Sequence, residues 1–185
     1  MREYYYFIAQ LPSLVYGQKP PMSSAHFKSL AEDLLEDSDL KVMEYLSFNN
    51  PFSSEGNCPF VKNWKNWERA LKLNLAKERA IKLKKNIPDG EIPFFPQEAS
   101  ITAVKAVDEK SPLDGEYLLD KARWTAIDEI AGRDYYSVNN IYAYYLKLLL
   151  LERRQGFNIE KGFADYKNLY AEILASAHHS SGEIK

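Results

Sequence analysis

Apolar residues recur every three or four positions through most of this sequence, and that spacing restricts its fold more than any other feature. The pattern is clear in residues 23–36, where Phe27, Leu30, Ala31 and Leu34 follow it. Residues at this spacing lie on one face of an α-helix, whereas strands show strict alternation. Because no convincing series of strands accompanies these stripes, we predict an all-α protein.

Capping residues and helix breakers divide the chain into predicted helices. Ser111 followed by Pro112 is a strong start signal, and Gly132 suits the position after the helix that follows. Ser38 and Asn158 are candidate caps for two further helices. The predicted helices cover residues 23–36, 38–46, 60–85, 98–108, 111–131, 137–154 and 158–177. The expected architecture is therefore a bundle of six to seven helices.

Domain organisation follows from chain length and from one loop. The 185 residues are enough to bury one core, so we predict a single all-helical domain over residues 1–185. The loop at residues 86–97 contains prolines and a glycine and is the best candidate for a boundary between two lobes. The segment 4–8 is either a short helix or an extended segment, and residues 178–185 are expected to be a frayed tail.

Motifs of the common enzyme classes are missing from the sequence. It has no glycine-rich phosphate loop and no G-x-S-x-G turn. Its histidines, His26, His178 and His179, are not spaced as zinc ligands on a helix. Glu116 and Asp120 lie one turn apart, and ion pairing on the helix surface explains them best. We therefore predict no enzymatic activity, no cofactor and no bound metal.

Cysteine content and apolar run length bear on location. The single cysteine, Cys58, excludes an intrachain disulfide and fits a reducing compartment. The longest apolar run, residues 141–151, is interrupted by Lys147 and is shorter than the roughly 20 residues that a spanning helix needs. We expect a cytoplasmic protein that meets the inner membrane only through a partner.

Charge is strongly segregated along the chain. Residues 61–85 contain nine Lys or Arg and two acids, whereas residues 1–60 and 86–185 are both acidic, and five acids lie within residues 32–39. These segments either lie on solvated faces and partly pair with each other, or form a docking surface for an acidic partner. The candidate partner-binding residues are Lys62, Lys65, Arg69, Lys72, Lys77, Arg79 and Lys82. The acidic remainder of the chain argues against nucleic acid.

Aromatic residues are abundant, at 14% of the chain. The clusters Tyr135–Tyr136 and Tyr142–Tyr144–Tyr145 fall in or beside predicted helices. Tyrosine packs its ring in a core while its hydroxyl reaches a polar partner. We expect these clusters to be core of a stiff bundle rather than a platform for stacking bases.

Two stretches resemble an uncharacterised bacterial family whose genes lie in V-type ATPase operons. They are residues 115–130 (GEYLLDKARWTAIDEI) and residues 136–156 (YSVNNIYAYYLKLLLLERRQG), and residues 5–14 and 67–80 are also similar to it. More distantly, residues 117–156 resemble the central-stalk family of V/A-type rotary ATPases in their helix–turn–helix–glycine layout. They do not carry the Asn-x-Arg signature of that family.

The resemblance implies a non-catalytic peripheral subunit or assembly factor of a bacterial V-type ATPase. Its partners would be ATPase subunits of the central stalk or the rotor ring. Such a role requires a stiff helical shape and complementary contacts rather than catalytic residues. The alternative is a free-standing helical adaptor that binds an acidic protein or RNA through the basic helix at residues 61–85.

Overall fold

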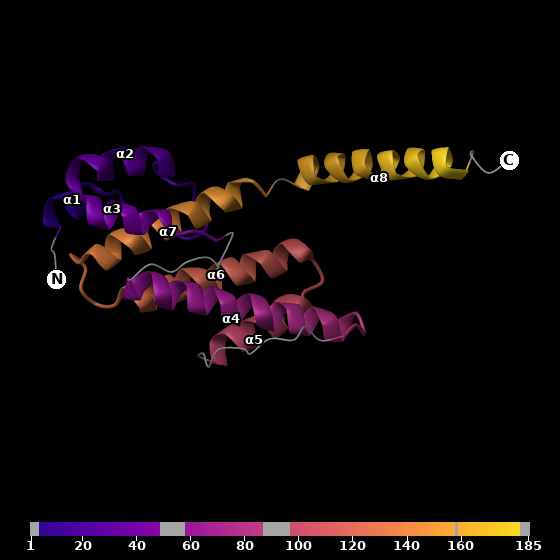
Figure 1. The fold of residues 1–185 in the computed structure, drawn as a ribbon, viewed down its shortest axis with the longest axis horizontal. Coiled ribbons are helices and arrows are strands. Elements are labelled where there is room, and N and C mark those ends of the chain that lie inside the picture. Colours follow the sequence, from indigo (N-terminus) through magenta and orange to yellow (C-terminus); the bar gives the residue numbers. More distant parts are fainter. Residues whose placement is uncertain (1–3, 49–57, 87–96, 158, 182–185) are drawn as a thin grey trace. The chain divides into compact units, whose positions relative to one another are not determined.

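The structure is a computed structural model, and it describes residues 4–48, 58–86, 97–157 and 159–181. Within these residues every regular element is an α-helix, which confirms the all-α prediction (Figure 1). The chain divides into two compact units, Met1–Glu152 and Arg153–Lys185. We describe each unit by itself.

Helix starts and ends largely follow the capping signals. In order along the described residues, the helices are α1 (Tyr5–Gln10), α2 (Ser24–Leu34), α3 (Asp37–Glu44), α4 (Pro59–Lys82), α5 (Gln97–Asp108), α6 (Pro112–Ala131), α7 (Val138–Gln155) and α8 (Ile159–Ser181). The Ser23 hydroxyl caps α2 by accepting a hydrogen bond from the backbone N–H of His26 at 3.1 Å. Gly132 follows α6 with a φ of 80°, a conformation that favours glycine.

Three local predictions need correction or completion. The short helix α3 begins at Asp37, with Glu36 at the cap position instead of Ser38, because Asp37 and Asp39 stabilise the positive end of its dipole. The segment at residues 4–8 becomes the helix α1. The helix α8 continues to Ser181 instead of fraying from residue 178. Asn158, the predicted cap of α8, lies outside the described residues.

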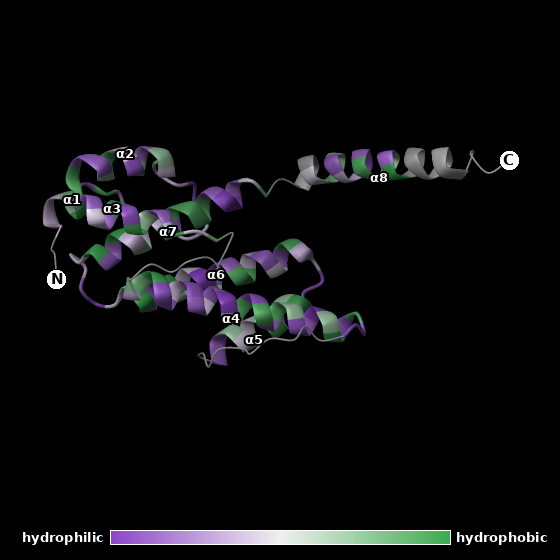
Figure 2. Cartoon of the chain, in the orientation of Figure 1, coloured by the Kyte–Doolittle hydropathy of each residue, from purple (hydrophilic) through white to green (hydrophobic). Residues whose placement is uncertain are grey.

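The core of the first unit forms around α4 and α7. The predicted stripe of Trp64, Trp67, Leu71 and Leu75 is buried, and the two indole rings stack with their centroids 5.9 Å apart. Most apolar residues of α7 are buried on several sides, as expected for a central helix, and green stretches mark hydrophobic residues along α7 in Figure 2. Burial of these side chains from water is the main stabilising contribution to the bundle.

The division of the chain does not follow the predicted lobe boundary at residues 86–97, most of which lie outside the described residues. The helices on either side of that loop, α4 and α5, pack against each other, and both pack against α6. These three helices therefore form one packed group inside the first unit.

The tyrosines divide into a buried and an exposed set. Tyr142, Tyr144 and Tyr145 pack in the core as predicted, and the Phe27 ring stacks on the latter two at 5.3 and 5.7 Å. The prediction is wrong for the other cluster, whose members lie in the loop between α6 and α7. Tyr135 is 72% exposed and Tyr136 is 46% exposed.

The second unit presents an apolar stripe on α8. Every described side chain between residues 162 and 173 is exposed. The stripe consists of Phe163, Tyr166, Leu169, Tyr170 and Ile173, each more than half exposed. The rings of Tyr166 and Tyr170 stack on each other at 6.2 Å along the helix.

The hydroxyl of Tyr144 makes the free energy of unfolding depend on pH in the alkaline range. It donates a hydrogen bond to the backbone oxygen of Pro12 at 2.8 Å, and burial raises the pKa of Tyr144 to about 12. A tyrosine in the unfolded chain ionises near pH 10, so above that pH the folded state retains a proton that the unfolded state has lost. The stabilisation from Tyr144 is therefore complete below pH 10 and is lost as the pH rises to 12.

We expect Tyr144→Phe to lower the free energy of unfolding by about 1 kcal/mol near pH 8, where it removes one hydrogen bond. Near pH 11 the difference between wild type and variant should shrink towards zero. Urea unfolding at the two pH values measures this change. Tyr166→Phe, on the exposed stripe of α8, is the control and should not alter the pH dependence. If the free energies of unfolding of wild type and Tyr144→Phe differ by the same amount at both pH values, the prediction is contradicted.

Candidate partner-binding site

The seven basic residues predicted to bind a partner do not share one surface. Lys65 is only 1% exposed, and its ammonium group lies 5.7 Å from the centre of the Tyr45 ring. A buried ammonium cannot reach a docking partner, so Lys65 is a core residue, contrary to the prediction. Its aliphatic stem is buried, and its charge faces an aromatic ring.

Two more of these residues form contacts within their own unit. Lys72 donates a hydrogen bond to the backbone oxygen of Phe48 at 2.6 Å, and its nitrogen lies 3.6 Å from a carboxylate oxygen of Glu68. Arg69 donates a hydrogen bond to the side-chain oxygen of Asn66 at 3.0 Å. The side chain of Lys62 is exposed and that of Lys77 is half-buried. These residues are spread around α4.

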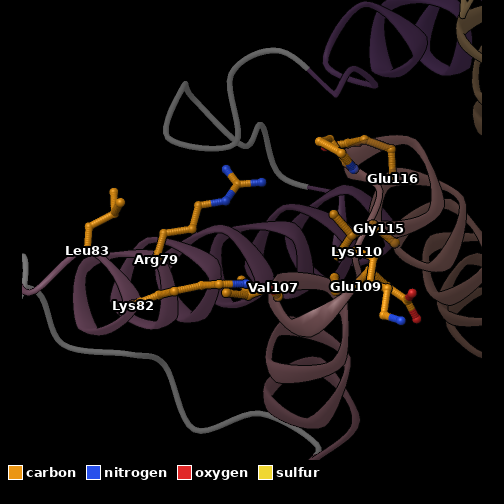
Figure 3. A pocket seen from close by; sticks show the side chains of 11 residues that line it. Arg79, Lys82, Leu83, Val107, Glu109, Lys110, Gly115 and Glu116 are labelled. Atoms are coloured by element: carbon orange, nitrogen blue, oxygen red, sulfur yellow. Dashed lines mark hydrogen bonds between the residues drawn. The ribbon is translucent and has the colours of Figure 1, made fainter.

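Two of the predicted residues, Arg79 and Lys82, line a pocket. This pocket, of about 440 Å³, lies between the end of α4, the end of α5 and the start of α6. Figure 3 shows Arg79 and Lys82 on α4, and Lys82 extends toward Val107 of α5. The Lys82 ammonium donates a hydrogen bond to the backbone oxygen of Val107. This bond satisfies a carbonyl at the negative end of α5 and ties α5 to α4.

The pocket combines an apolar floor with a charged rim. Leu83 and Leu119 are among the apolar residues that line it, and Leu83 is 64% exposed. Lys110 adds a third cation to Arg79 and Lys82, while Glu109 and Glu116 contribute negative charge. Neither the guanidinium of Arg79 nor the ammonium of Lys110 is hydrogen-bonded or ion-paired to any residue that the structure describes. These two cations are therefore available to an anionic group next to an apolar surface.

Close packing of α5 on α6 fixes one wall of the pocket. A Cβ atom at Gly115 would lie 2.8 Å from the backbone oxygen of Ala106, which is closer than real Cβ contacts. Only a residue without a side chain allows the two backbones to approach this closely. The position of the α5 wall therefore depends on Gly115.

A buried ion cluster joins the α4 and α6 walls. Arg123 of α6 donates hydrogen bonds to both carboxylate oxygens of Glu68 at 3.0 and 3.1 Å, and to Asp120 at 2.9 Å. All three side chains are almost fully buried. Burial lowers the pKa of Arg123, but the two carboxylates outweigh it and raise the pKa above its ordinary value. The guanidinium therefore remains charged and fixes α6 to α4.

This cluster corrects the expectation of a surface ion pair at Asp120, which is buried together with its partner Arg123. One signal in the sequence could have indicated the cluster. Glu68 lies four residues after Trp64 and three before Leu71, so it belongs to the buried stripe of α4. A carboxylate at such a position must find a cation, because an unpaired buried charge is very unfavourable.

Metal-ligating clusters and membrane-spanning helices are both absent from the part of the chain that the structure describes. No group of three or more His, Cys, Asp and Glu side chains there is arranged to hold a metal ion. Among the described helices, none combines the length and the apolar character needed to cross a membrane.

Part of the chain matches a protein-family model. Residues 96–176 match a family model described as a protein of unknown function (DUF2764). The matched range includes α5, α6 and α7, and therefore two walls of the pocket and the loop with Tyr135 and Tyr136. No curated protein and no solved structure matches the chain.

Proposed function

We propose that this chain is a non-catalytic helical protein that binds a component of a bacterial V-type ATPase, as a peripheral subunit or an assembly factor. The observation that carries partner binding is the pocket between α4, α5 and α6, with its apolar floor and available cations. The ATPase is suggested by the resemblance of residues 115–130 and 136–156 to a family encoded in V-type ATPase operons. The central stalk and the rotor ring are the proposed places of contact.

The chemistry of the pocket defines what the partner presents. An apolar side chain that enters the floor beside Leu83 gains the free energy of its burial. A neighbouring carboxylate gains from Arg79 and Lys110, which lie at the rim. The expected ligand is therefore a segment in which an acidic residue lies next to an aliphatic one. Interfaces of this kind obtain affinity from the apolar centre and specificity from the charged rim.

Rigid walls support this function because a preformed pocket loses little entropy on binding. The ion cluster of Arg123 holds α4 against α6, and Lys82 and Gly115 hold α5 in place. A protein that transmits force or holds an intermediate in assembly needs such fixed geometry.

Reversing the two available cations should abolish ATPase binding. The double variant Arg79→Glu and Lys110→Glu should recover at least tenfold less V-type ATPase from gently solubilised membranes, because its rim then repels an acidic segment. The matched control is Lys62→Glu with Lys121→Glu, which reverses two exposed charges that do not line the pocket. The control should recover ATPase subunits as the wild type does. Quantitative mass spectrometry of the eluted subunits is the measurement.

The result separates the proposal from its alternative. Wild-type protein that recovers none of the ATPase subunits contradicts the ATPase assignment and leaves the free-standing adaptor, which would be tested against an acidic protein or RNA. Equal losses in both double variants would contradict the role of the pocket. Copy number in the purified enzyme then decides the role, since one copy per complex indicates a stalk component and a substoichiometric amount indicates an assembly factor.

A further inference from the structure

Two exposed tyrosines begin α1, and two more lie in the loop between α6 and α7, which contacts α1. We call these four residues the tyrosine patch: Tyr5, Tyr6, Tyr135 and Tyr136. Tyr5 and Tyr6 of α1 are 52% and 72% exposed, and the rings of Tyr5 and Tyr136 lie with their centroids 4.5 Å apart. The backbone N–H of Tyr4 donates a hydrogen bond to the backbone oxygen of Tyr136 at 3.0 Å. This bond holds α1 against the loop, so the patch is a fixed part of the first unit.

Such a patch is better explained by binding than by folding. The chain buries other tyrosines of the same region in its core, so these four rings are not needed to fill it. Tyrosine offers a large rigid ring and loses little conformational entropy on binding, and it is enriched in protein interfaces. A groove of about 260 Å³ adjoins the patch, and Tyr135 lines it together with Ile8 and Leu11.

The charge around the patch favours a cation. The helix α6 ends beside the patch, and its last turn contains no basic residue. The last carbonyl groups of a helix carry partial negative charge. Glu129 in that turn is exposed, and Asp134 in the loop accepts a hydrogen bond from the backbone N–H of Tyr136 at 3.2 Å. Lys147 lines the groove, but its charge is paired with Asp128, which lines the groove as well. Arg133 is the cation of the loop itself, and the negative groups of the loop and the α6 end outnumber it.

Arginine fits this combination better than lysine. A guanidinium is flat, so it stacks on an aromatic ring while its edge donates two parallel hydrogen bonds to a carboxylate. A lysine ammonium is a compact, strongly hydrated charge without that plane. We propose that the tyrosine patch binds an arginine-bearing segment of a partner protein. The guanidinium stacks on the rings of Tyr5 and Tyr136, Glu129 supplies the opposite charge, and the groove beside Tyr135 takes apolar atoms of the segment.

This surface is separate from the pocket between α4, α5 and α6, and it selects a ligand of the opposite charge. The proposal does not rest on the ATPase assignment. A protein with both surfaces can contact an acidic segment and a basic segment at the same time, which suits a component that joins two partners.

The test measures binding of a fluorescein-labelled peptide of alternating arginine and glycine to the full chain by fluorescence anisotropy. The arginine peptide should bind more tightly than the matching lysine–glycine peptide. Tyr136→Ala should weaken binding about threefold to fivefold, the size expected for one exposed cation–π contact. Glu129→Lys should weaken it by at least as much, and Tyr136→Phe should retain wild-type affinity because it keeps the ring.

Tyr166→Ala is the control, because Tyr166 is an exposed tyrosine on α8, outside the patch, and should not affect binding. Tyr5→Ala serves as a second patch variant, because Tyr5 is 52% exposed and its ring contacts that of Tyr136, so the variant should fold normally and still weaken binding. The proposal is overturned by any of three results. These are no measurable binding at low salt, equal affinity for the arginine and lysine peptides, or an equal loss in the patch variants and in Tyr166→Ala.

Discussion

Replacing Arg123 with methionine should lower the free energy of unfolding by about 3–5 kcal/mol, the cost of breaking a buried ion cluster by removing one partner. Methionine fills much of the volume of arginine but carries no charge. The carboxylates of Glu68 and Asp120, both almost fully buried, would then face each other in the core without their cation. Water is excluded from this site and cannot replace the lost hydrogen bonds.

Urea denaturation near pH 7 measures this loss of unfolding free energy. Urea is uncharged, so it adds no salt that would screen the charges. The matched control is Arg133→Met, at an exposed arginine in the loop after α6, which should change stability by no more than about 0.5 kcal/mol. A triple variant with Glu68→Met, Asp120→Leu and Arg123→Met should regain most of the stability, because it leaves no unpaired charge buried; Lys72, which loses Glu68, is one-third exposed and keeps its bond to Phe48. If Arg123→Met is as stable as the wild type, the cluster is not buried as the structure places it.

Substitution of Gly115 with alanine should destabilise the protein by about 1–3 kcal/mol, the usual cost of overpacking a close contact. The sign of this change in stability is informative, because glycine-to-alanine substitution inside an ordinary helix stabilises the helix by about 1 kcal/mol. At Gly115 the new methyl group would meet the backbone oxygen of Ala106 at 2.8 Å. A backbone atom cannot rotate away as a side chain can, so α5 must move away from α6.

Gly162→Ala in α8 is the control, since a Cβ atom there would meet nothing within 4 Å. It should leave the first unit unchanged and strengthen α8. Urea unfolding measures how much unfolding free energy Gly115→Ala loses. Amide hydrogen exchange should be faster than in the wild type mainly in α5. A stabilised Gly115→Ala would mean that α5 and α6 lie farther apart than in the structure. The same displacement of α5 should weaken partner binding at the pocket.

Local signals explain why most of the fold could be predicted. Proline at the first position of α6 and glycine after its end act through the backbone of one or two residues, so the sequence alone reveals them. The stripe from Trp64 to Leu75 depends only on helical spacing and is buried as expected. Both kinds of signal hold regardless of which helices become neighbours.

The candidate site could be predicted only in part, because its key features depend on distant partners. Glu68 is buried because Arg123, 55 residues away, neutralises it, and no local pattern announces that pairing. Charge alone predicts a surface position for Lys65, although its side chain is almost fully buried. Composition predicts a core position for Tyr135 and Tyr136, but they follow Gly132 in a loop and belong to no helix face.

The ion cluster has a consequence for how the chain avoids wrong structures. Two helices joined only by hydrocarbon side chains could slide by one turn, about 5.4 Å, and still bury apolar surface. Arg123 pairs with Asp120 on its own helix, but it can reach Glu68 of α4 in only one alignment of α4 and α6. After such a slide Glu68 would be separated from Arg123 inside a dry core, so the misaligned bundle would be far less stable than the native one. We therefore expect a variant with uncharged apolar residues at Glu68, Asp120 and Arg123 to be stable but to populate alternative helix pairings during folding.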